Sequence, residues 1–390
     1  MFAPLWNTIK RELRRLTSRR IYVTMMLIVP MLTALFFIDL MKSGLPLPVP
    51  VTVVDMDRSA MSRRITRALQ ASQYLDITRS DDSYHEALSR LRRGDSYGFF
   101  YIPRNFERDC LNGSQPTLSY YTNMSIFVPG TMSLKGFTTT AVVTEMGVVK
   151  TTLTAVGATD AAAMSVIQPV VIDSHGLNNP WLNYSVYLNP SFISGVIALL
   201  VMLVTAFSIG EEIKRGTSPR WLDTAGGSML VALVGKLAPQ TVIFSAVGIA
   251  CEALMFRFCH YPLNNHASHI ILAMVLLVIA CQAFAVIICE ILPNLRLAIT
   301  VCSLTGILSF SVVGFSFPVD QMYGGIGILA SIIPLRYFFL IYVDQALNGI
   351  PLFFSRSYYI ALLIFPLLTF PLLRLSLIHI SEPTRLRCIS

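Results

Sequence analysis

Six long apolar runs alternate with polar segments along the chain. A run of about 20 apolar residues is long enough to cross a bilayer as a helix. The pattern therefore predicts a polytopic α-helical membrane protein with six transmembrane helices. The first helix is expected at 21–41, and the other five are expected within 189–374, at 191–209, 229–256, 270–288, 297–317 and 358–373.

The composition agrees with this fold class. Of the 390 residues, 54% are hydrophobic and 13% are charged, whereas a globular protein has roughly 25% charged residues. These values exclude a disordered chain and an ordinary soluble enzyme. The seven cysteines have no spacing typical of a disulfide framework or a zinc site, and we expect no metal in this chain.

The first 20 residues carry six basic side chains and one acid, Glu12, with apolar residues at helical spacing. This pattern predicts a cytoplasmic amphipathic helix at 1–20 that lies in the membrane interface. A plain basic flank of the first span is the other interpretation, and it is compatible with the first. Both interpretations put the N-terminus in the cytoplasm.

Residues 42–188 have charges throughout and no run long enough to span a membrane. The segment alternates predicted strands with predicted helices, at 51–54, 59–71, 75–77, 81–93, 97–102 and 118–121. This alternation predicts a mixed α/β domain between helices 1 and 2. Residues 125–168 are expected to form a helical stalk. A cytoplasmic N-terminus would make this domain extracytoplasmic.

A broken apolar segment at 318–350 lies between the fifth and sixth runs. Gly325, Gly327 and Pro334 interrupt it and leave two pieces of about ten residues, each too short to span. We therefore expect a re-entrant hairpin that enters the membrane from the outside. Such a backbone is stable at membrane depth only where protein or a wet cavity covers it.

Four short segments resemble the motifs of a known family. They are a valine-rich strand with an acidic turn at 51–59, a strand with an Ile-Pro turn at 97–106, an acidic and basic element ending in Gly-Thr at 211–217, and Gly-Phe-Ser-Phe-Pro at 314–318. The four segments occur in the order typical of that family and at the matching places between the apolar runs. Over residues 1 to about 375, the chain therefore resembles the membrane subunits of bacterial type-2 ATP-binding-cassette (ABC) exporters. That class has a large external domain between its first two spans.

The resemblance implies a function and partners. It implies an ABC exporter permease in the bacterial inner membrane that moves a substrate out of the cytoplasm or inner leaflet. A separate ATPase subunit would drive it, and a second permease copy or a paralogue would complete the path. A periplasmic adaptor and an outer-membrane channel are further candidate partners. Membrane lipid would surround the spans, and no nucleic-acid partner is expected.

The sequence has no phosphate-binding loop of the form G-x-x-x-x-G-K-[ST]. Its Gly235-Lys236 pair is followed by Leu237 and is expected to pack within a span. We therefore expect no enzyme activity and no cofactor in this chain, with ATP and Mg bound by the partner ATPase.

The loop 211–224 is the longest internal loop on the predicted cytoplasmic side. The resemblance implies that it lies at the coupling surface for the ATPase, while a solvated turn is the other interpretation. The candidate coupling residues are Glu211, Glu212, Arg215, Gly216, Thr217 and Trp221.

The end of the fifth span and the hairpin after it are candidates for an external gate, in which aromatic side chains close the exit path. The alternative is that they only pack the outer ends of the spans. The candidate gate residues are Phe315, Phe317, Pro318, Pro334, Tyr337 and Phe338.

Several charged residues need a separate interpretation. The position of Glu252 near the outer end of the third span favours an interfacial structural role over a substrate or proton role, and the same holds for Arg336 and Asp344. Asp55 and Asp57 fit a turn at the end of a strand better than a Ca²⁺ site.

A second class of function is a membrane-anchored external binding or sensing protein without transport. The five spans after the α/β domain favour transport, because an anchor needs only one or two. Residues 375–390 resemble the translation of a sequencing adaptor, and we expect them not to be native.

Overall fold

The computed structural model describes residues 2–45, 47–169, 175–180 and 182–372. The expected non-native tail at 375–390 lies outside this range. Contacts divide the chain into an α/β unit, 45–175, and a span unit made of 1–44 and 176–390. The expected domain boundary at 188 falls within a helix, α9, which already begins at Tyr184.

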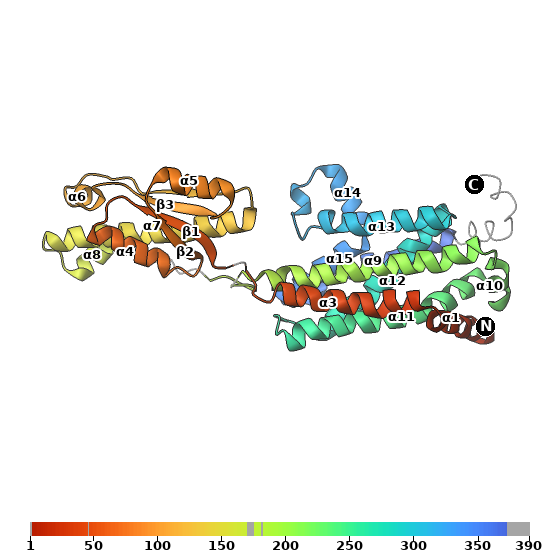
Figure 1. Cartoon of the computed structure of the whole chain (residues 1–390). Helices are drawn as coiled ribbons and strands as arrows, with labels where there is room; N and C mark the ends of the chain where they lie inside the picture. The colour runs from red at the N-terminus through yellow and green to blue at the C-terminus, as the bar shows by residue number, and fades with distance from the viewer. Residues whose placement is uncertain (1, 46, 170–174, 181, 373–390) are drawn as a thin grey trace. The chain divides into compact units, whose positions relative to one another are not determined.

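The α/β unit is built on a four-stranded sheet in the order β2-β1-β3-β4 (Figure 1). The central strand β1 (Val49–Asp55) runs parallel to β2 (Leu75–Asp81) and β3 (Gly98–Ile102). The edge strand β4 (Ser119–Thr122) pairs antiparallel with β3. The four strands predicted from the sequence are all present, with bounds that differ by a few residues.

Helices cover both faces of this sheet, so β1 is buried on both sides. Helices α4 (Ala60–Gln70) and α7 (Phe127–Ala155) pack on one face, where Ile65 and Phe137 meet the strand valines. Helix α5 (Tyr84–Arg93) covers the other face, where Ala87 meets Val54 and Phe99. The unit is completed by α6 (Phe106–Leu111) and α8 (Asp160–Ile167).

Asp55 and Asp57 hold the turn after β1, as the sequence predicts. The Asp55 carboxylate accepts hydrogen bonds from two backbone N–H groups and from the Ser62 hydroxyl, at 2.7–3.0 Å. Asp57 accepts from the backbone N–H of Glu107. No group of three metal-binding side chains occurs among the described residues, and both acids have structural partners.

In the part of the chain that the structure describes, the span unit contains six helices long and apolar enough to cross a membrane. They are Arg20–Leu40, built from α2 (Arg20–Val23), η1 (Thr24–Ile28) and α3 (Val29–Leu40); α9 (Tyr184–Lys214); Met229–Phe258, built from α11 (Met229–Ala253) and η2 (Leu254–Phe258); α12 (Ala267–Ile291); α13 (Leu295–Val312); and α16 (Leu352–Thr369). Two short helices, α1 (Phe2–Ser18) and α10 (Ser218–Thr224), flank the spans.

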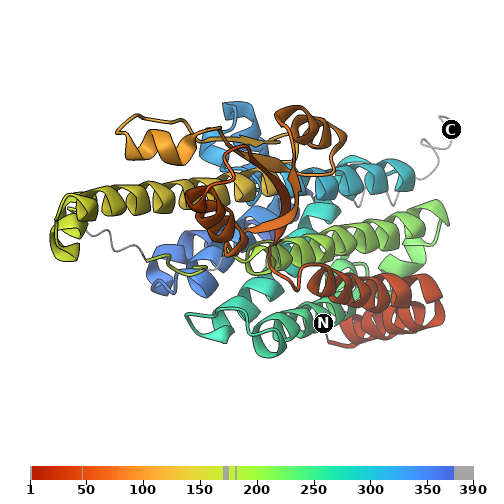
Figure 2. The ribbon, with the colours of Figure 1, turned by 60° about the vertical axis from the view of Figure 1, so that its left-hand side comes forward.

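Helix α9 is the central helix of the span unit. It lies between α3 and α13 in two views of the molecule (Figures 1 and 2) and also packs against α12. Its 31 residues correspond to roughly 46 Å at 1.5 Å per residue. One helix therefore runs from one end of the unit to the other.

Pro190 lies inside α9 without breaking it. Proline has no N–H, so the carbonyl four residues earlier loses its helical partner. That carbonyl belongs to Val186, and the Tyr342 hydroxyl donates a 2.7 Å hydrogen bond to it. A side chain more than 150 residues away thus allows α9 to begin before the proline, and the sequence pattern gives no sign of it.

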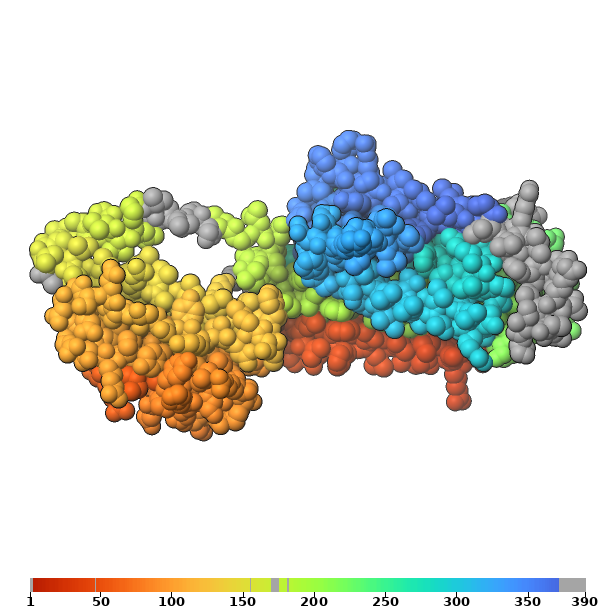
Figure 3. All heavy atoms as spheres, turned by 90° about the horizontal axis from the view of Figure 1, so that it is seen from above, coloured from red at the N-terminus to blue at the C-terminus, as the bar shows by residue number. Residues whose placement is uncertain are grey.

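The segment at 318–350 is broken, as its glycines and proline predict. After the short turn η3 (Val319–Gln321), helix α14 (Gly324–Ile332) is followed by α15 (Pro334–Tyr342) and its extension η4 (Val343–Leu347), with an 89° bend between them. Figure 3 shows α14, in light blue, on one face of the span unit. A bend of this size fits either a broken span or a re-entrant hairpin.

Candidate functional site: a buried charge cluster between α1, α9 and α11

Helix α1 packs closely along α11, which brings its acid into the span unit. Thr8 of α1 lies against Gly235 of α11, where a Cβ atom would come within 2.7 Å of the Thr8 Cβ. Glycine is therefore required for this approach. The buried side of α1 also carries Glu12 and Leu16, which are 1% and 3% exposed.

Lys236 is the centre of the cluster. Its side chain is fully buried, and its Nζ atom lies 3.0 Å from carboxylate oxygens of both Glu12 of α1 and Glu212 of α9. Gln240, one turn further along α11, donates to Glu12 and to the Ser208 hydroxyl, at 3.4 and 3.2 Å. Helix α1, whose Glu12 is 224 residues from Lys236 in the chain, therefore meets α9 and α11 at one ammonium group.

Arginines of α1, and Arg19 directly after it, also pair with the α9 carboxylates. Arg11 lies 2.9 Å from Glu212, and Arg15 forms short hydrogen bonds with both Glu211 and Glu212. Arg19 pairs with Glu211 through another short contact. We call these seven residues the charge cluster: Arg11, Glu12, Arg15, Arg19, Glu211, Glu212 and Lys236.

Arg15 stays charged within the cluster. Burial by itself lowers the pKa of this guanidinium, but the hydrogen bond to Glu211 and the nearby carboxylates outweigh burial and raise its pKa. Buried ions cost several kcal/mol each unless opposite charges and hydrogen bonds compensate them. Removing one partner would therefore leave an uncompensated buried charge. Separation of α1, α9 and α11 is unfavourable for the same reason, so we expect the three helices to move as one body.

Helix α10 is attached to the same cluster through Trp221. The indole N–H donates to the carbonyl of Ala232 at 3.2 Å, and Lys236 Nζ lies 4.8 Å from the centre of the ring. Thr217, at the N-cap of α10, hydrogen-bonds to the Glu212 carboxylate. A displacement of α10 would therefore act directly on α9 and α11.

The structure separates the six candidate coupling residues into two groups. Glu211, Glu212 and Trp221 are 5%, 1% and 1% exposed, and their side chains are directed into the chain itself. Arg215 and Gly216 are exposed, and Thr217 is half-buried. Arg215, Gly216 and Thr217 can thus contact a partner directly. The side chains of Glu211, Glu212 and Trp221 are already buried within the chain. Glu211 and Glu212 also belong to the last turn of α9, not to a loop.

Five of the seven members of the charge cluster are not among the sequence-based candidates: Arg11, Glu12, Arg15, Arg19 and Lys236. Gln240, which hydrogen-bonds to the cluster, is not a candidate either. Lys236 was expected only to pack, and Glu12 was expected to lie on an interfacial helix. One signal was available: a lysine inside an apolar span needs an acidic partner, and an acid in a basic N-terminal helix can supply it.

The candidate gate residues form an aromatic group with mixed exposure. Phe315 is buried against Phe192, Phe310 and Phe339, with ring centroids 5.5–6.3 Å apart. Phe338 and Pro334 are also buried, and the Tyr337 ring lies 6.3 Å from Phe365. Phe317 and Pro318 are exposed. The structure therefore gathers most of these residues around α15.

Amides and hydroxyls hold η4 in place beside the aromatic group. Asn265 donates to the Gln345 side chain at 2.8 Å and to the Ile350 carbonyl at 3.1 Å. Gln345 in turn donates to Ser355, whose hydroxyl donates to Asp344. Arg336 donates to the Val313 carbonyl at 3.4 Å. Asp344 and Arg336 thus both have hydrogen-bond partners within the chain.

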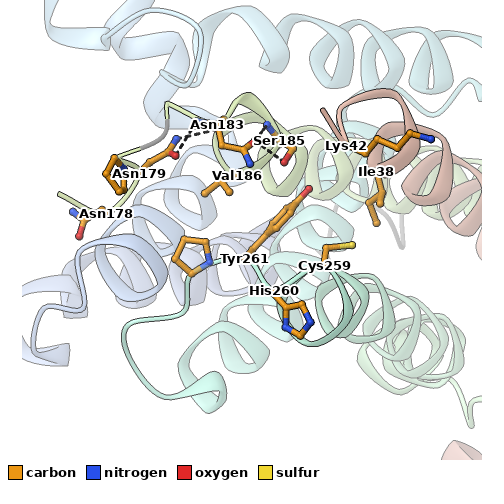
Figure 4. A pocket seen from close by; sticks show the side chains of 12 residues that line it. Ile38, Lys42, Asn178, Asn179, Asn183, Ser185, Val186, Cys259, His260 and Tyr261 are labelled. Atoms are coloured by element: carbon orange, nitrogen blue, oxygen red, sulfur yellow. Dashed lines mark hydrogen bonds between the residues drawn. The ribbon is translucent and has the colours of Figure 1, made fainter. Parts of the chain in front are cut away.

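A polar pocket of about 570 Å³ lies where α3 ends and α9 begins. Figure 4 shows its lining, with Lys42 beyond the end of α3 and Tyr261 directed toward α9. Asn183 caps α9 by accepting from the backbone and hydroxyl of Ser185, and it exchanges two hydrogen bonds with Asn179. The side-chain amides of Asn179 and Asn183 thus form hydrogen bonds within the chain. Lys42, paired with Asp39, remains exposed to solvent.

The fold and the site define a multi-pass membrane protein whose helices converge on a charge cluster at one end. Residues 20–375 match the family model described as ABC-2 family transporter protein, and the chain belongs to that family. Members are membrane components of ABC transporters, so membership implies a partner ATPase subunit. No curated protein and no solved structure matches this chain.

Proposed function

We propose that the chain is the permease subunit of an ABC exporter, moving a substrate out of the cytoplasm or the inner leaflet. Family membership supports transport over the alternative of a membrane-anchored binding or sensing protein. The charge cluster carries the proposal, because it joins the exposed α10 region to the long central helix α9.

In this proposal the exposed side chains around α10 contact the ATPase. Arg215, Arg220 and Asp223 are exposed and lie on either side of the buried Trp221. Glu212 and Trp221 act as positioning residues, since their own side chains are satisfied within the chain. The ATPase would bind ATP and Mg, and this chain would supply the moving helices.

Movement at the cluster would reach the far end of the spans through α9. The carboxylates of Glu211 and Glu212 are on its last turn, and Phe192 near its other end packs on Phe315. A single stiff helix thus connects the proposed coupling surface with the proposed external gate. Two copies of the chain, or this chain and a paralogue, would enclose the path.

The proposed orientation has the N-terminus and α10 in the cytoplasm of a bacterial cell and the α/β unit on the outside of the inner membrane. Six spans and a basic N-terminal helix support it. An adaptor and an outer-membrane channel would act beyond the α/β unit.

ATP hydrolysis tests the coupling proposal. The full chain is reconstituted with its ATPase subunit in proteoliposomes, and the double variant Arg215→Ala/Arg220→Ala is compared with the native chain. We expect at least a fivefold fall in hydrolysis. Thermal stability should change little, because both side chains are exposed and Glu211, which Arg215 pairs with at 2.7 Å, keeps Arg15 and Arg19 as partners. The matched control is Arg92→Ala/Arg93→Ala, on the α/β unit, which should hydrolyse ATP normally. Equal hydrolysis by all three proteins would reject the proposed contact.

A further inference from the structure

Glu252, near the end of α11, is a buried carboxyl without a partner. The residue is 4% exposed, and neither carboxyl oxygen has a hydrogen-bond partner among the described residues. The carboxylates of the charge cluster, by contrast, are paired. Burial of a polar group without a partner is unfavourable, and ionisable residues inside membrane spans mark functional sites by default.

A cavity lies beside this carboxyl. It measures about 290 Å³ and lies between α11, η2 and the start of α12, with Glu252 among its lining residues. The rest of the lining is apolar apart from Arg257, which is exposed and forms no ion pair with Glu252 within 4 Å. The other lining residues are Ile249, Ala253, Phe256, Leu263, Ala267, Ile270 and Ile271.

The backbone changes its winding at this point. The π-helical turn η2 begins at Leu254, two residues after Glu252, and it places Phe256 on the cavity. An aromatic ring beside an unpaired carboxyl offers two kinds of attraction for a cation, ionic and cation–π.

We propose that this cavity binds the primary ammonium group of an amphipathic amine. The ammonium would pair with Glu252 and lie near Phe256, and the first methylenes would fill the apolar remainder. Ala253, Ala267 and Ile271 are exposed at the cavity, so the rest of the chain can leave toward the surface of the span unit. A volume of about 290 Å³ holds a head group and a few carbons but not a whole lipid.

Two sources share this chemistry, a free long-chain amine and the head group of an aminophospholipid. An ammonium group would stabilise the ionised form of the Glu252 carboxyl, whereas an anion or a neutral alcohol would not. The inference does not rest on transport, because it concerns a binding site at the end of α11 remote from the charge cluster.

Photolabelling of the full chain in phosphatidylcholine nanodiscs tests the site. The probe is dodecylamine with a diazirine near its amine, and labelled peptides are mapped by mass spectrometry. We expect labelling within 249–271, and at least a tenfold decrease in Glu252→Gln. The matched control is Glu290→Gln, which removes an equally buried, unpartnered carboxyl at the other end of α12 and should label normally.

Two further measurements keep the test decisive. Ala267→Phe retains the carboxyl but fills the cavity, so it should also lose labelling, even if Glu252→Gln proves unstable. Equal labelling of the native chain and either variant, or equal labelling by the matching diazirine dodecanol, would overturn the proposal. Added phosphatidylethanolamine distinguishes the sources: competition with the probe identifies the lipid head group, and unchanged labelling identifies the free amine.

Discussion

Lys236 Nζ lies 3.0 Å from a carboxylate oxygen of Glu12, although 224 residues separate the two in the chain. The same ammonium group is equally close to Glu212. The N-terminal helix is therefore an integral part of the span unit at this point and not a detached basic flank.

Replacing Lys236 with methionine should destabilise the protein strongly. The substitution keeps the length of the side chain but leaves two buried carboxylates without their shared cation, and such a loss costs about 3–5 kcal/mol. Unfolding of the full chain in detergent measures it. The control is Lys42→Met, because Lys42 is 73% exposed and pairs with an exposed acid, so this variant should unfold like the native protein. An equal fall in the free energy of unfolding for Lys236→Met and Lys42→Met would contradict the stabilising role of the charge cluster.

Tyr342→Phe should destabilise the start of α9. It removes the hydroxyl that serves the Val186 carbonyl, and an unsatisfied buried acceptor costs about 1–3 kcal/mol. Thermal unfolding of the full chain measures the change. Tyr323 is 85% exposed, so Tyr323→Phe should unfold like the native protein, and a native-like Tyr342→Phe would show that another donor replaces the hydroxyl.

Asn265→Ala should loosen η4 without affecting the charge cluster. It removes hydrogen bonds to Gln345 and Ile350, each worth about 0.5–1.5 kcal/mol. A loss of about 1.4 kcal/mol makes the open form of the segment tenfold more populated. Hydrogen–deuterium exchange should accelerate about tenfold at 343–350 and stay unchanged at 8–16. Ser268→Ala, at an exposed neighbouring position, is the control. Unchanged exchange at 343–350 would show that these amides do not hold the segment.

Cys110 of the α/β unit should react slowly with alkylating reagents at neutral pH. Burial, helped by the nearby carboxylates of Asp109, Asp57 and Glu107, raises the pKa of its thiol. Only the thiolate reacts, so the midpoint of the rate against pH should lie above the value of about 8.5 for a free cysteine. Mass spectrometry of the Cys110 peptide follows the reaction. Unfolding in urea should return the midpoint to about 8.5, and an identical midpoint in both states would contradict the prediction.

Much of the fold follows from local sequence patterns. The six spans are long apolar runs, the α/β unit follows from alternating short elements, and the break near Ile333 follows from Gly325, Gly327 and Pro334. Each of these features depends on residues that are close together in the chain.

The site was predictable only in part, because its members come from distant segments. Glu212 and Trp221 could be selected near a loop, but their burial depends on Glu12, Arg15 and Lys236, which no local pattern connects. The start of α9 was missed for a similar reason, since Tyr342 supplies the hydrogen bond that Pro190 cannot. The cavity beside Glu252 depends on the packing of η2 against α12.

Site-specific photocrosslinking in intact membranes tests the central claim most directly. Benzoylphenylalanine is placed at Arg220, on the exposed side of α10, and separately at Arg92 of the α/β unit. An exporter permease driven through α10 should crosslink to its ATPase subunit from position 220 and not from position 92. Crosslinking from position 92, or from neither position while the complex remains assembled, would contradict the proposed coupling surface and orientation.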